Sequence, residues 1–411
     1  MVKPTYFLPT NFTLPEDTYK ALNEDYHQTL LEPEEHIKNR YSIDVSSFYG
    51  PYKIRHPFGK ASGQLSTNQA QVKSDLEGGL AFTVLKTVIA ESEDHQSEME
   101  AWKIKAPRME VEKITSQNGE EGYTVTWKGR GWEKTLEEYL EFLEESLALA
   151  KNYPIIPSCK YHLPPLGEEY KVDEYIYTTQ KIYQSWRKYR EEELVLEKDF
   201  SATLAGTDLA GAKEQVLAWL TEVPAKIKEA SDASIYLGVK LMNTMLPDEF
   251  QREMVKLLLG PDSNWLGDYA VCFNRLFDPN KGFAGKIGVA YGGYDLSDRN
   301  LWALEELLPN KPTRPISATG NICSGRLMLE YALRGAINGQ LHTFFQLPQT
   351  EYAPIEGSRT QKAIHELLFN PSKGLVAGLL YIRDKLNKNQ EPFSFIEVTK
   401  LNPNELNEVK R

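Results

Sequence analysis

The segment RPISATGNICSGRLMLEYALRGAINGQLHTFF, residues 314–345, contains the pattern that decides the fold. A short apolar strand is expected at 314–320, a helix at 325–335 and a second strand at 338–344. Two apolar strands joined by an amphipathic helix are typical of a parallel β-α-β unit. The sequence therefore predicts parallel strands with helical crossovers in this region.

The same alternation extends outward through most of the chain. Six further runs are short, apolar and bounded by Gly, Pro or polar residues, as buried strands are. They lie near 59–62 and at 81–88, 153–159, 193–200, 233–241 and 269–274. Helical patterns separate most of them. About eight strands favour a (β/α)8 TIM barrel, an α/β fold, over an open sheet, which would usually carry a Gly-x-Gly-x-x-Gly turn after its first strand.

Three regions are expected along the chain. Residues 1–50 form an N-terminal helical arm, residues 51–350 form the barrel, and residues 351–411 add helices that pack on it. Residues 91–132 interrupt the alternation after the second strand. Within them, TSQNGEEGYTVTW predicts a β-hairpin with Asn118-Gly119 at its turn. Such an insertion would lie on the C-terminal face of a barrel, where active sites form.

Composition excludes several classes of protein. The chain has 411 residues, with 47 Lys and Arg against 58 Asp and Glu, a net charge of −11. This acidic balance argues against nucleic-acid binding, which needs clustered basic residues. Three scattered cysteines are too few for an iron–sulfur cluster or a Cys₄ zinc site, and we expect no metal. No apolar run reaches about 18 residues. We expect a soluble cytoplasmic protein without a membrane span, and leave open whether it is a homodimer.

Two lysines and one glycine stand at expected strand ends. Lys86 and Lys240 each end an apolar run. A lysine there usually extends to solvent, but a cation near the pyrimidine edge of a flavin would stabilise its anionic reduced form. Gly320 follows the seventh strand, where barrels commonly hold a phosphate, although it could equally begin an ordinary helix. Asn274 could bind a ring-shaped substrate or simply start a helix.

A set of motifs in this order resembles the flavin barrel of dihydroorotate dehydrogenases and the matching domain of dihydropyrimidine dehydrogenases. The motifs are PFGKASG (57–63), DLEGGLAFTVLKT (75–87), APRM (106–109), LGVKL (237–241), GFAGKIGVAYGG (282–293) and ISATGNICSG (316–325), followed by Gln340 and HTF (342–344). Together they extend over most of the expected barrel, and the set is far more specific than any one of them.

The resemblance implies FMN as the cofactor. The residues implied to contact its ring, ribityl chain and phosphate are, in chain order, Ala61, Ser62, Gly63, Lys86, Thr87, Lys240, Gly288, Gly320, Asn321, His342 and Thr343. Lys240 would lie at the pyrimidine edge, and the last four would hold the phosphate. Asn321 and His342 replace glycines of the family, and both can still offer backbone N–H groups.

The substrate half departs from the family pattern. Trp127 stands where the family has a substrate-binding asparagine, and Asp199 replaces a flavin-side asparagine. In one alignment Ala202 replaces the catalytic Cys or Ser. In another, shifted by one residue, Ser201 becomes the catalytic residue, and both alignments stay open. The residues expected to contact substrate are Trp127, Thr203, Asn274 and Arg275.

The proton-transfer residue is the least determined part of the expected site. Ser201 is the best single candidate, with Asp199 as its nearby base and Lys86 beside the flavin. Tyr161 or His162, after the third strand, are the alternatives.

We therefore expect an FMN-dependent oxidoreductase that acts on a CH–CH or C=C bond of a small-molecule substrate other than orotate. One alternative is a divergent dihydroorotate or dihydropyrimidine dehydrogenase. Another is a flavin-binding barrel that has lost catalytic activity. No second nucleotide-binding fingerprint indicates the electron donor or acceptor, which stays unidentified.

Overall fold

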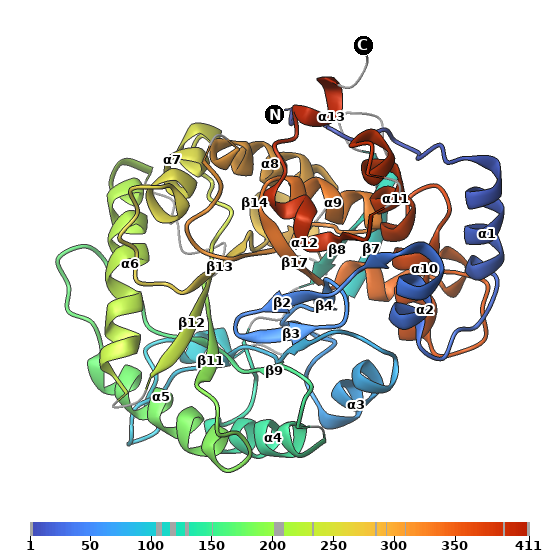
Figure 1. Ribbon diagram of the computed structural model, residues 1–411. Helices are drawn as coiled ribbons and strands as arrows, with labels where there is room; N and C mark the ends of the chain where they lie inside the picture. Colours follow the sequence, from blue (N-terminus) through green and yellow to red (C-terminus); the bar gives the residue numbers. More distant parts are fainter. Residues whose placement is uncertain are drawn as a thin grey trace.

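A curved parallel β-sheet surrounded by helices forms the centre of the molecule (Figure 1). The computed structural model describes residues 3–103, 109–115, 121–127, 131–149, 151–200, 209–231, 234–283, 286–292, 294–308, 310–388 and 391–408. Among these residues, no helix combines the length and the apolar character needed to cross a bilayer.

The described residues contribute ten strands to this sheet, in the order β6–β10–β11–β12–β13–β16–β17–β4–β5–β9. Their bounds are β4 (Phe58–Lys60), β5 (Thr83–Val84), β6 (Val88–Ile89), β9 (Ile155–Ile156), β10 (Ser158–Lys160), β11 (Leu194–Asp199), β12 (Ile235–Lys240), β13 (Tyr269–Cys272), β16 (Ile316–Ala318) and β17 (Ala336–Leu341). Every pairing between them is parallel. The predicted parallel α/β organisation is confirmed.

Two predicted strands are each broken into two pieces. Strands β5 and β6 belong to one stretch of chain interrupted at residues 85–87, and Pro157 separates β9 from β10. Strand β5 pairs with β9, and β6 pairs with β10. Strand β17, the last of these strands along the chain, pairs with β4, the first along the chain, at Gly339 and Phe58. The eight predicted strands therefore correspond to ten hydrogen-bonded segments of the described chain.

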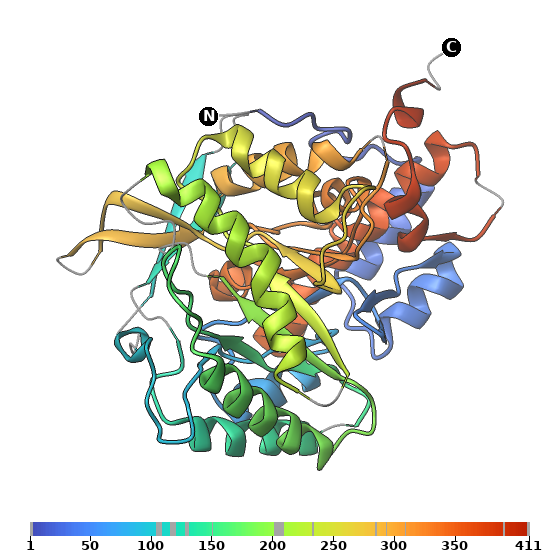
Figure 2. The same cartoon turned by 90° about the vertical axis from the view of Figure 1, so that its left-hand side faces the viewer.

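Helices follow most of the strands and pack on the outer face of the sheet (Figures 1 and 2). They are α3 (Gln69–Glu77), α4 (Leu136–Leu149), α5 (Val172–Arg187), α6 (Leu209–Glu229), α7 (Asp248–Leu259), α8 (Tyr294–Leu304) and α9 (Gly325–Leu333). Short 3₁₀ helices are η1 (Glu100–Trp102), η3 (Glu305–Leu307), η4 (Thr343–Gln346) and η5 (Gln349–Glu351). All of these α-helices except α5 coincide with predicted helical patterns.

Helix α5 was not predicted, because its residues favour strands. The segment is rich in Tyr and Thr, which are common in β-sheets. In the structure, Tyr175, Thr178, Thr179, Ile182 and Trp186 are all buried. This spacing produces one apolar face against the sheet, so tertiary packing overrides local propensity.

Apolar side chains fill both sides of the sheet. An inner cluster includes Phe82, Val84, Val195 and Val271, and a larger outer cluster lies between the sheet and the helices. The hairpin of β2 (Ser47–Tyr49) and β3 (Tyr52–Ile54) adds Tyr49 to the inner cluster, at the strands' N-terminal ends. Figure 1 shows this hairpin against the sheet. The C-terminal strand ends are therefore the place where a site can form.

A second sheet of four antiparallel strands is attached near those C-terminal ends. It consists of β7 (Met109–Thr115), β8 (Glu121–Trp127), β14 (Leu276–Phe283) and β15 (Lys286–Gly292), in the order β14–β15–β8–β7. Strands β7 and β8 confirm the predicted hairpin, whose turn residues lie outside the described residues. The β14–β15 hairpin was not among the predicted strands, and it projects from the body of the molecule (Figure 2).

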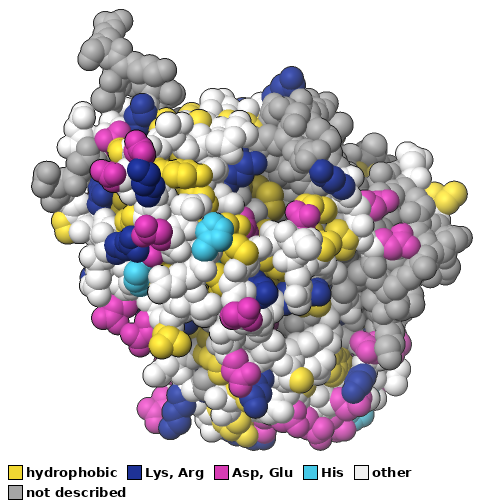
Figure 3. All heavy atoms as spheres, turned by 90° about the vertical axis from the view of Figure 1, so that its right-hand side faces the viewer, with side chains coloured by type: hydrophobic (Ala, Val, Ile, Leu, Met, Phe, Trp, Pro, Cys, Tyr) yellow, Lys and Arg dark blue, Asp and Glu magenta, His cyan; other side chains and the backbone are white. Residues whose placement is uncertain are grey.

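The two terminal regions pack against each other. The N-terminal region holds α1 (Glu16–Tyr26), α2 (Pro33–Tyr41) and β1 (Ile43–Asp44), and the C-terminal region holds α10 (Arg359–Phe369), α11 (Leu375–Lys385), β18 (Phe393–Ser394), α12 (Phe395–Lys400) and α13 (Glu405–Glu408). The Tyr26 hydroxyl donates to Glu366 (2.6 Å), and β1 pairs with β18. On this side of the molecule, acidic and basic side chains are interspersed (Figure 3).

A buried charge network holds the beginning of the chain on helix α9. Glu330 and Arg334 are both fully buried and lie 3.0 Å apart. Glu330 accepts a hydrogen bond from the backbone N–H of Leu8 (2.8 Å), and Arg334 donates to the carbonyl oxygen of Thr5 (2.6 Å). Burying charges is costly unless each has a partner, so this network depends on both side chains.

Replacing Glu330 with Ala is expected to lower the free energy of unfolding by about 3 kcal/mol, because Arg334 loses a buried counter-charge and Leu8 loses its acceptor. Denaturant titration measures the change. Glu16→Ala is the control, since the Glu16 side chain is 80% exposed and its pair with Lys20 should contribute under about 1 kcal/mol. Equal small effects of both substitutions would contradict this account.

Candidate functional site

The carboxylate of Asp199 is shared by side chains from three other strand ends. Asp199 is the last residue of β11. Its Oδ1 accepts a hydrogen bond from Nδ2 of Asn274 (2.6 Å), and its Oδ2 accepts one from Oγ1 of Thr87 (3.3 Å). The ammonium of Lys160, at the end of β10, lies 3.5 Å from Oδ2. The structure therefore brings together Asp199, Thr87 and Asn274, three of the predicted site residues.

Thr87 extends this network to the first strand of the sheet. Its hydroxyl lies 2.8 Å from Oγ of Ser62 and 3.0 Å from Oγ of Ser158. Ser62 is the second residue after β4, and the backbone N–H of its neighbour Ala61 donates to the carbonyl oxygen of Leu341 (2.9 Å). The predicted ring-contacting segment 61–63 is thus connected to Asp199 through hydroxyl groups.

Asn274 uses both of its amide hydrogens within the protein. Nδ2 donates to Asp199 and to the carbonyl oxygen of Phe200 (2.7 Å), and Oδ1 accepts from the backbone N–H of Arg275 (2.9 Å). An amide nitrogen carries two hydrogens and an amide oxygen two lone pairs. Asn274 therefore has only acceptor capacity left to offer a ligand.

Cations outnumber carboxylates among the described residues around Asp199. Lys86, Lys160 and Lys240 are each at most 5% exposed. Burial alone would raise the pKa of Asp199, but Lys160, followed by Lys240, outweighs burial and lowers it to about 2. A carboxylate with such a low pKa is a poor proton acceptor near neutral pH. The predicted role of Asp199 as a base for Ser201 is therefore disfavoured, and an electrostatic role is favoured.

The pKa of Lys86 lies close to neutral pH. Burial lowers the pKa of Lys86 to about 7, and the positive charges of Arg275 and Lys160 act in the same direction. Efficient proton transfer requires a pKa near the working pH. Lys86 can therefore hold or release a proton at this site.

Glu197 lies deeper in the sheet, two residues before Asp199. Its carboxylate accepts from Nε2 of Gln340 (2.6 Å) and from the hydroxyl of Tyr49 (3.0 Å), and lies 3.6 Å from the ammonium of Lys240. Burial raises the pKa of Glu197, and Lys240 opposes that rise. Glu197 therefore holds the ammonium of Lys240 near the end of β12.

The predicted phosphate-binding residues follow strands β16 and β17, and β17 pairs with β4. Gly320 has φ +122°, and a Cβ there would meet Nδ2 of Asn300 at 2.3 Å, so only glycine fits. The backbone N–H of Gln64 donates to Nε2 of His342 (3.2 Å). Nδ2 of Asn321 and Nε2 of Gln64 are buried and have no hydrogen-bond partner among the described residues. Unpaired buried donors are rare in folded proteins, and they fit an anionic ligand.

The structure describes only some of the remaining predicted residues. Ser201 and Thr203 lie outside the described residues, as does the side chain of Trp127, whose backbone ends β8. Gly288 lies within β15 of the antiparallel sheet rather than in a loop. Thr343 is the first residue of η4.

Tyr161 points away from the cluster. Its hydroxyl lies 2.7 Å from Oγ1 of Thr179 on α5, and its ring stacks on Tyr175. The hydroxyl of Tyr161 is therefore bonded to α5 and not to the Asp199 network. His162 remains half-buried, and burial lowers its pKa.

Lys160 belongs to the Asp199 cluster but was not among the predicted site residues. It ends an apolar run as Lys86 and Lys240 do, so the same criterion would have found it. The expected strand was ended one residue too early, at Cys159, which concealed the pattern.

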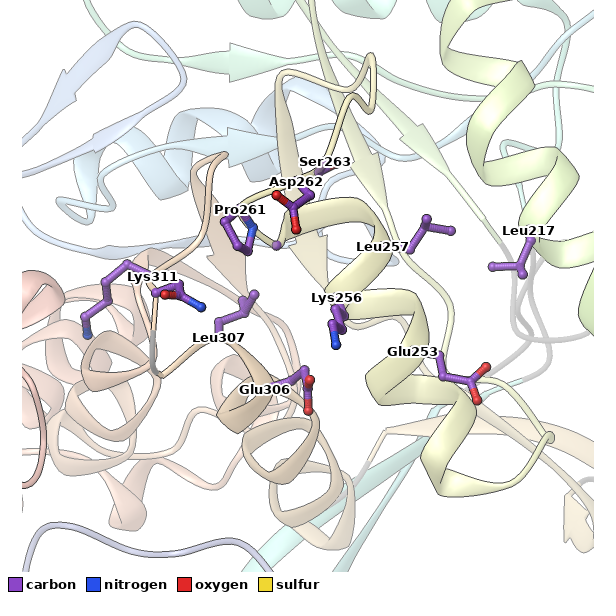
Figure 4. Close-up of a pocket in the computed structure, with 12 residues that line it drawn as sticks. Leu217, Glu253, Lys256, Leu257, Pro261, Asp262, Ser263, Glu306, Leu307 and Lys311 are labelled. Carbon is purple, nitrogen blue, oxygen red and sulfur yellow. The ribbon is translucent and has the colours of Figure 1, made fainter.

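A cavity of about 750 Å³ lies elsewhere, between α6, α7 and η3 (Figure 4). Its lining includes Leu217, Lys256, Asp262 and Glu306. The adjoining segments lead into the N-terminal ends of β13 and β16. In parallel α/β folds, ligands usually bind at the opposite, C-terminal ends of the strands, so this cavity is separate from the candidate site.

Comparison with models of known protein families gives no match, and comparison with curated protein sequences gives none either. The resemblance to flavin barrels therefore rests on the sequence motifs, and the geometry described above is independent of it.

Lys86→Met is expected to stabilise the protein. Because its folded-state pKa of about 7 lies below the ordinary value of 10.5, Lys86 binds its proton less tightly in the folded state than in the unfolded state. The cost is full below pH 7 and disappears as the pH rises toward 10.5. The variant should gain up to about 4 kcal/mol at pH 6, and the gain should shrink above pH 7.

Denaturant titrations at several pH values measure this gain. Lys73→Met, at a side chain that is 60% exposed, is the control and should change little. A Lys86→Met protein that is less stable than the wild type at pH 6 would contradict the assignment.

Proposed function

We propose that the protein is an FMN-dependent oxidoreductase that acts on a CH–CH or C=C bond of a substrate other than orotate. The proposal takes up the motif resemblance. The observation that carries it is the pair of unpaired buried donors, Asn321 and Gln64, at strand ends beside a cation-rich cluster. The donors suit a phosphate, and the cations suit a ring that becomes negatively charged.

The proposal includes a closed (β/α)8 barrel. The support is that β5 and β6 continue one another, as do β9 and β10, and that each piece of one pairs with a piece of the other. Counted in this way, the ten segments of the described sheet become eight strands, with β4 between β5 and β17. Parallel barrels of this kind carry phosphate sites after their seventh and eighth strands.

Each part of the site then has a role toward FMN. Asn321, His342, Thr343 and the backbone after Gly320 would hold the phosphate. Ala61, Ser62, Gly63 and Thr87 would line the ring, and Lys240 would lie at its pyrimidine edge. FMN, when bound, accepts or gives the hydride. The buried Lys240 charge, held next to Glu197, would favour the reduced ring.

Proton transfer is assigned to Lys86, because burial gives it a pKa of about 7. Ser201, which lies outside the described residues, stays the second candidate. In this scheme, Asp199 does not accept a proton. It holds Thr87 and Asn274 in place and offsets the positive charge of Lys86.

The bonding of Asn274 supports a substrate other than orotate. A site that recognises a polar ring needs free donors and acceptors, and it rejects ligands that leave them unpaired. Both amide hydrogens of Asn274 are already used inside the protein. Arg275, next in the chain, is proposed to contact a carboxylate or carbonyl group of the substrate.

FMN binding tests the proposal and the phosphate assignment together. Asn321→Leu is expected to weaken FMN binding by about 1–3 kcal/mol, a loss of roughly 5- to 150-fold, because the phosphate loses a buried donor. Quenching of FMN fluorescence by the purified chain measures the affinity. Asn310→Leu, in the outer cavity, is the matched control and should bind FMN as the wild type does. Equal binding by both variants would refute the phosphate assignment.

Lys240→Met is expected to lower the midpoint potential of the bound flavin, because the reduced ring loses its counter-charge. Dye-coupled reductive titration of the reconstituted protein measures the potential. Lys256→Met, on the outer cavity, should leave it unchanged. A potential in Lys240→Met equal to that of the wild type would remove Lys240 from the pyrimidine edge.

A further inference from the structure

Lys160 is a buried cation at the centre of the candidate site. The proposed roles toward FMN do not include this residue. It is the last residue of β10 and pairs with Ile89 of β6. Its side chain is 4% exposed, and its ammonium lies 3.5 Å from Oδ2 of Asp199. Burying a charged lysine this deeply costs free energy of folding, so a favourable interaction must offset that cost.

The favourable interaction is the one between Lys160 and the carboxylate of Asp199. The two oxygens of this carboxylate are held by Asn274, Thr87 and Lys160, from three different strand ends. Lys160 is the cation that acts most strongly on it. If Asp199 took up a proton, it would lose its charge, and its hydroxyl hydrogen would face groups that already donate to it. The neutral carboxyl group would then accept the hydrogen bond from the Asn274 amide more weakly than the carboxylate does.

The other charges around Asp199 come from every neighbouring element. Lys198 and Glu197 lie on β11 itself, Lys240 lies on β12, and Lys86 lies between β5 and β6. Two further charged groups act on Lys86, namely Arg275 after β13 and Glu133 before α4. Lys198 donates to the backbone carbonyl of Asp199 (2.9 Å), so its ammonium does not replace that of Lys160 at the carboxylate.

We propose that Lys160 is a positioning residue of this site: its ammonium keeps Asp199 charged, and through Asp199 it fixes the side chains of Thr87 and Asn274. The chemical purpose of this positioning rests on the proposed function, but the positioning itself does not require a bound cofactor. If Lys160 has this role, Asn274 presents the same acceptor, Oδ1, to a ligand across the whole working pH range.

The test is a pH titration followed by NMR on the full chain, without flavin. The side-chain amide signals of Asn274, assigned with Asn274→Ser, report on its acceptor, and the carboxyl carbon of Asp199 reports on its charge. In the wild type, both should stay constant from pH 7 down to about pH 3, since the Asp199 pKa is about 2. In Lys160→Met, the pKa of Asp199 should rise by about one unit or more, and the Asn274 signals should titrate with it.

Two further variants make the outcome decisive. Lys160→Arg keeps the charge and should restore the constant Asn274 signals, which a purely structural role for the lysine stem would not require. In an Asp199→Asn background, Lys160→Met should cause no further change in Asn274, because Lys160 acts through Asp199. Asn274 signals in Lys160→Met that match the wild type across the titration would overturn the proposal, as would a change in the Asp199→Asn background.

FMN reconstitution of the same proteins separates the two claims. If the wild type binds no FMN while the titration behaves as described, the proposed function fails and the positioning role stands. If FMN binds and the titration is unchanged in Lys160→Met, the proposed function stands and the positioning role fails. Should Lys160→Met not fold, Lys160→Gln gives the same comparison with a polar side chain.

Discussion

The carboxylate of Asp199 is the contact on which the site depends. It sits at the end of β11 and joins Thr87, Asn274 and Lys160, which come from three other strand ends. Parallel strands bring their carboxyl ends to one edge, so residues far apart in the sequence can share one anion there. Because the neighbouring lysines keep the carboxylate ionised, it can anchor these groups near neutral pH.

The buried lysines impose a cost that the fold alone does not explain. Lys86, Lys160 and Lys240 are almost completely buried, and the carboxylates of Asp199 and Glu197 lie within 4 Å of only Lys160 and Lys240 among them. Stability would favour apolar side chains at these positions. Residues that cost stability and gather at one strand edge are typical of functional sites. The unpaired donors of Asn321 and Gln64 lie at neighbouring strand ends, and as buried polar groups without a partner they also cost stability.

The sequence predicted the parallel strands well, because each is a short apolar run with a clear boundary. It failed where tertiary contacts decide the structure: α5 is helical because of its buried face, and β14–β15 is a hairpin because it pairs with β8. Ser62, Thr87, Asp199 and Asn274 were identified as site residues, but their mutual bonding depends on strand register, which a single sequence does not show. Lys160 was missed because its strand was ended one residue early.

The most direct test of the account is a crystal structure of the chain grown with FMN. The account predicts one FMN at the C-terminal strand ends, with its phosphate at Asn321 and His342 and its pyrimidine edge at Lys240. FMN bound in the outer cavity lined by Lys256 and Glu306, or crystals that exclude it at saturating concentration, would contradict the account.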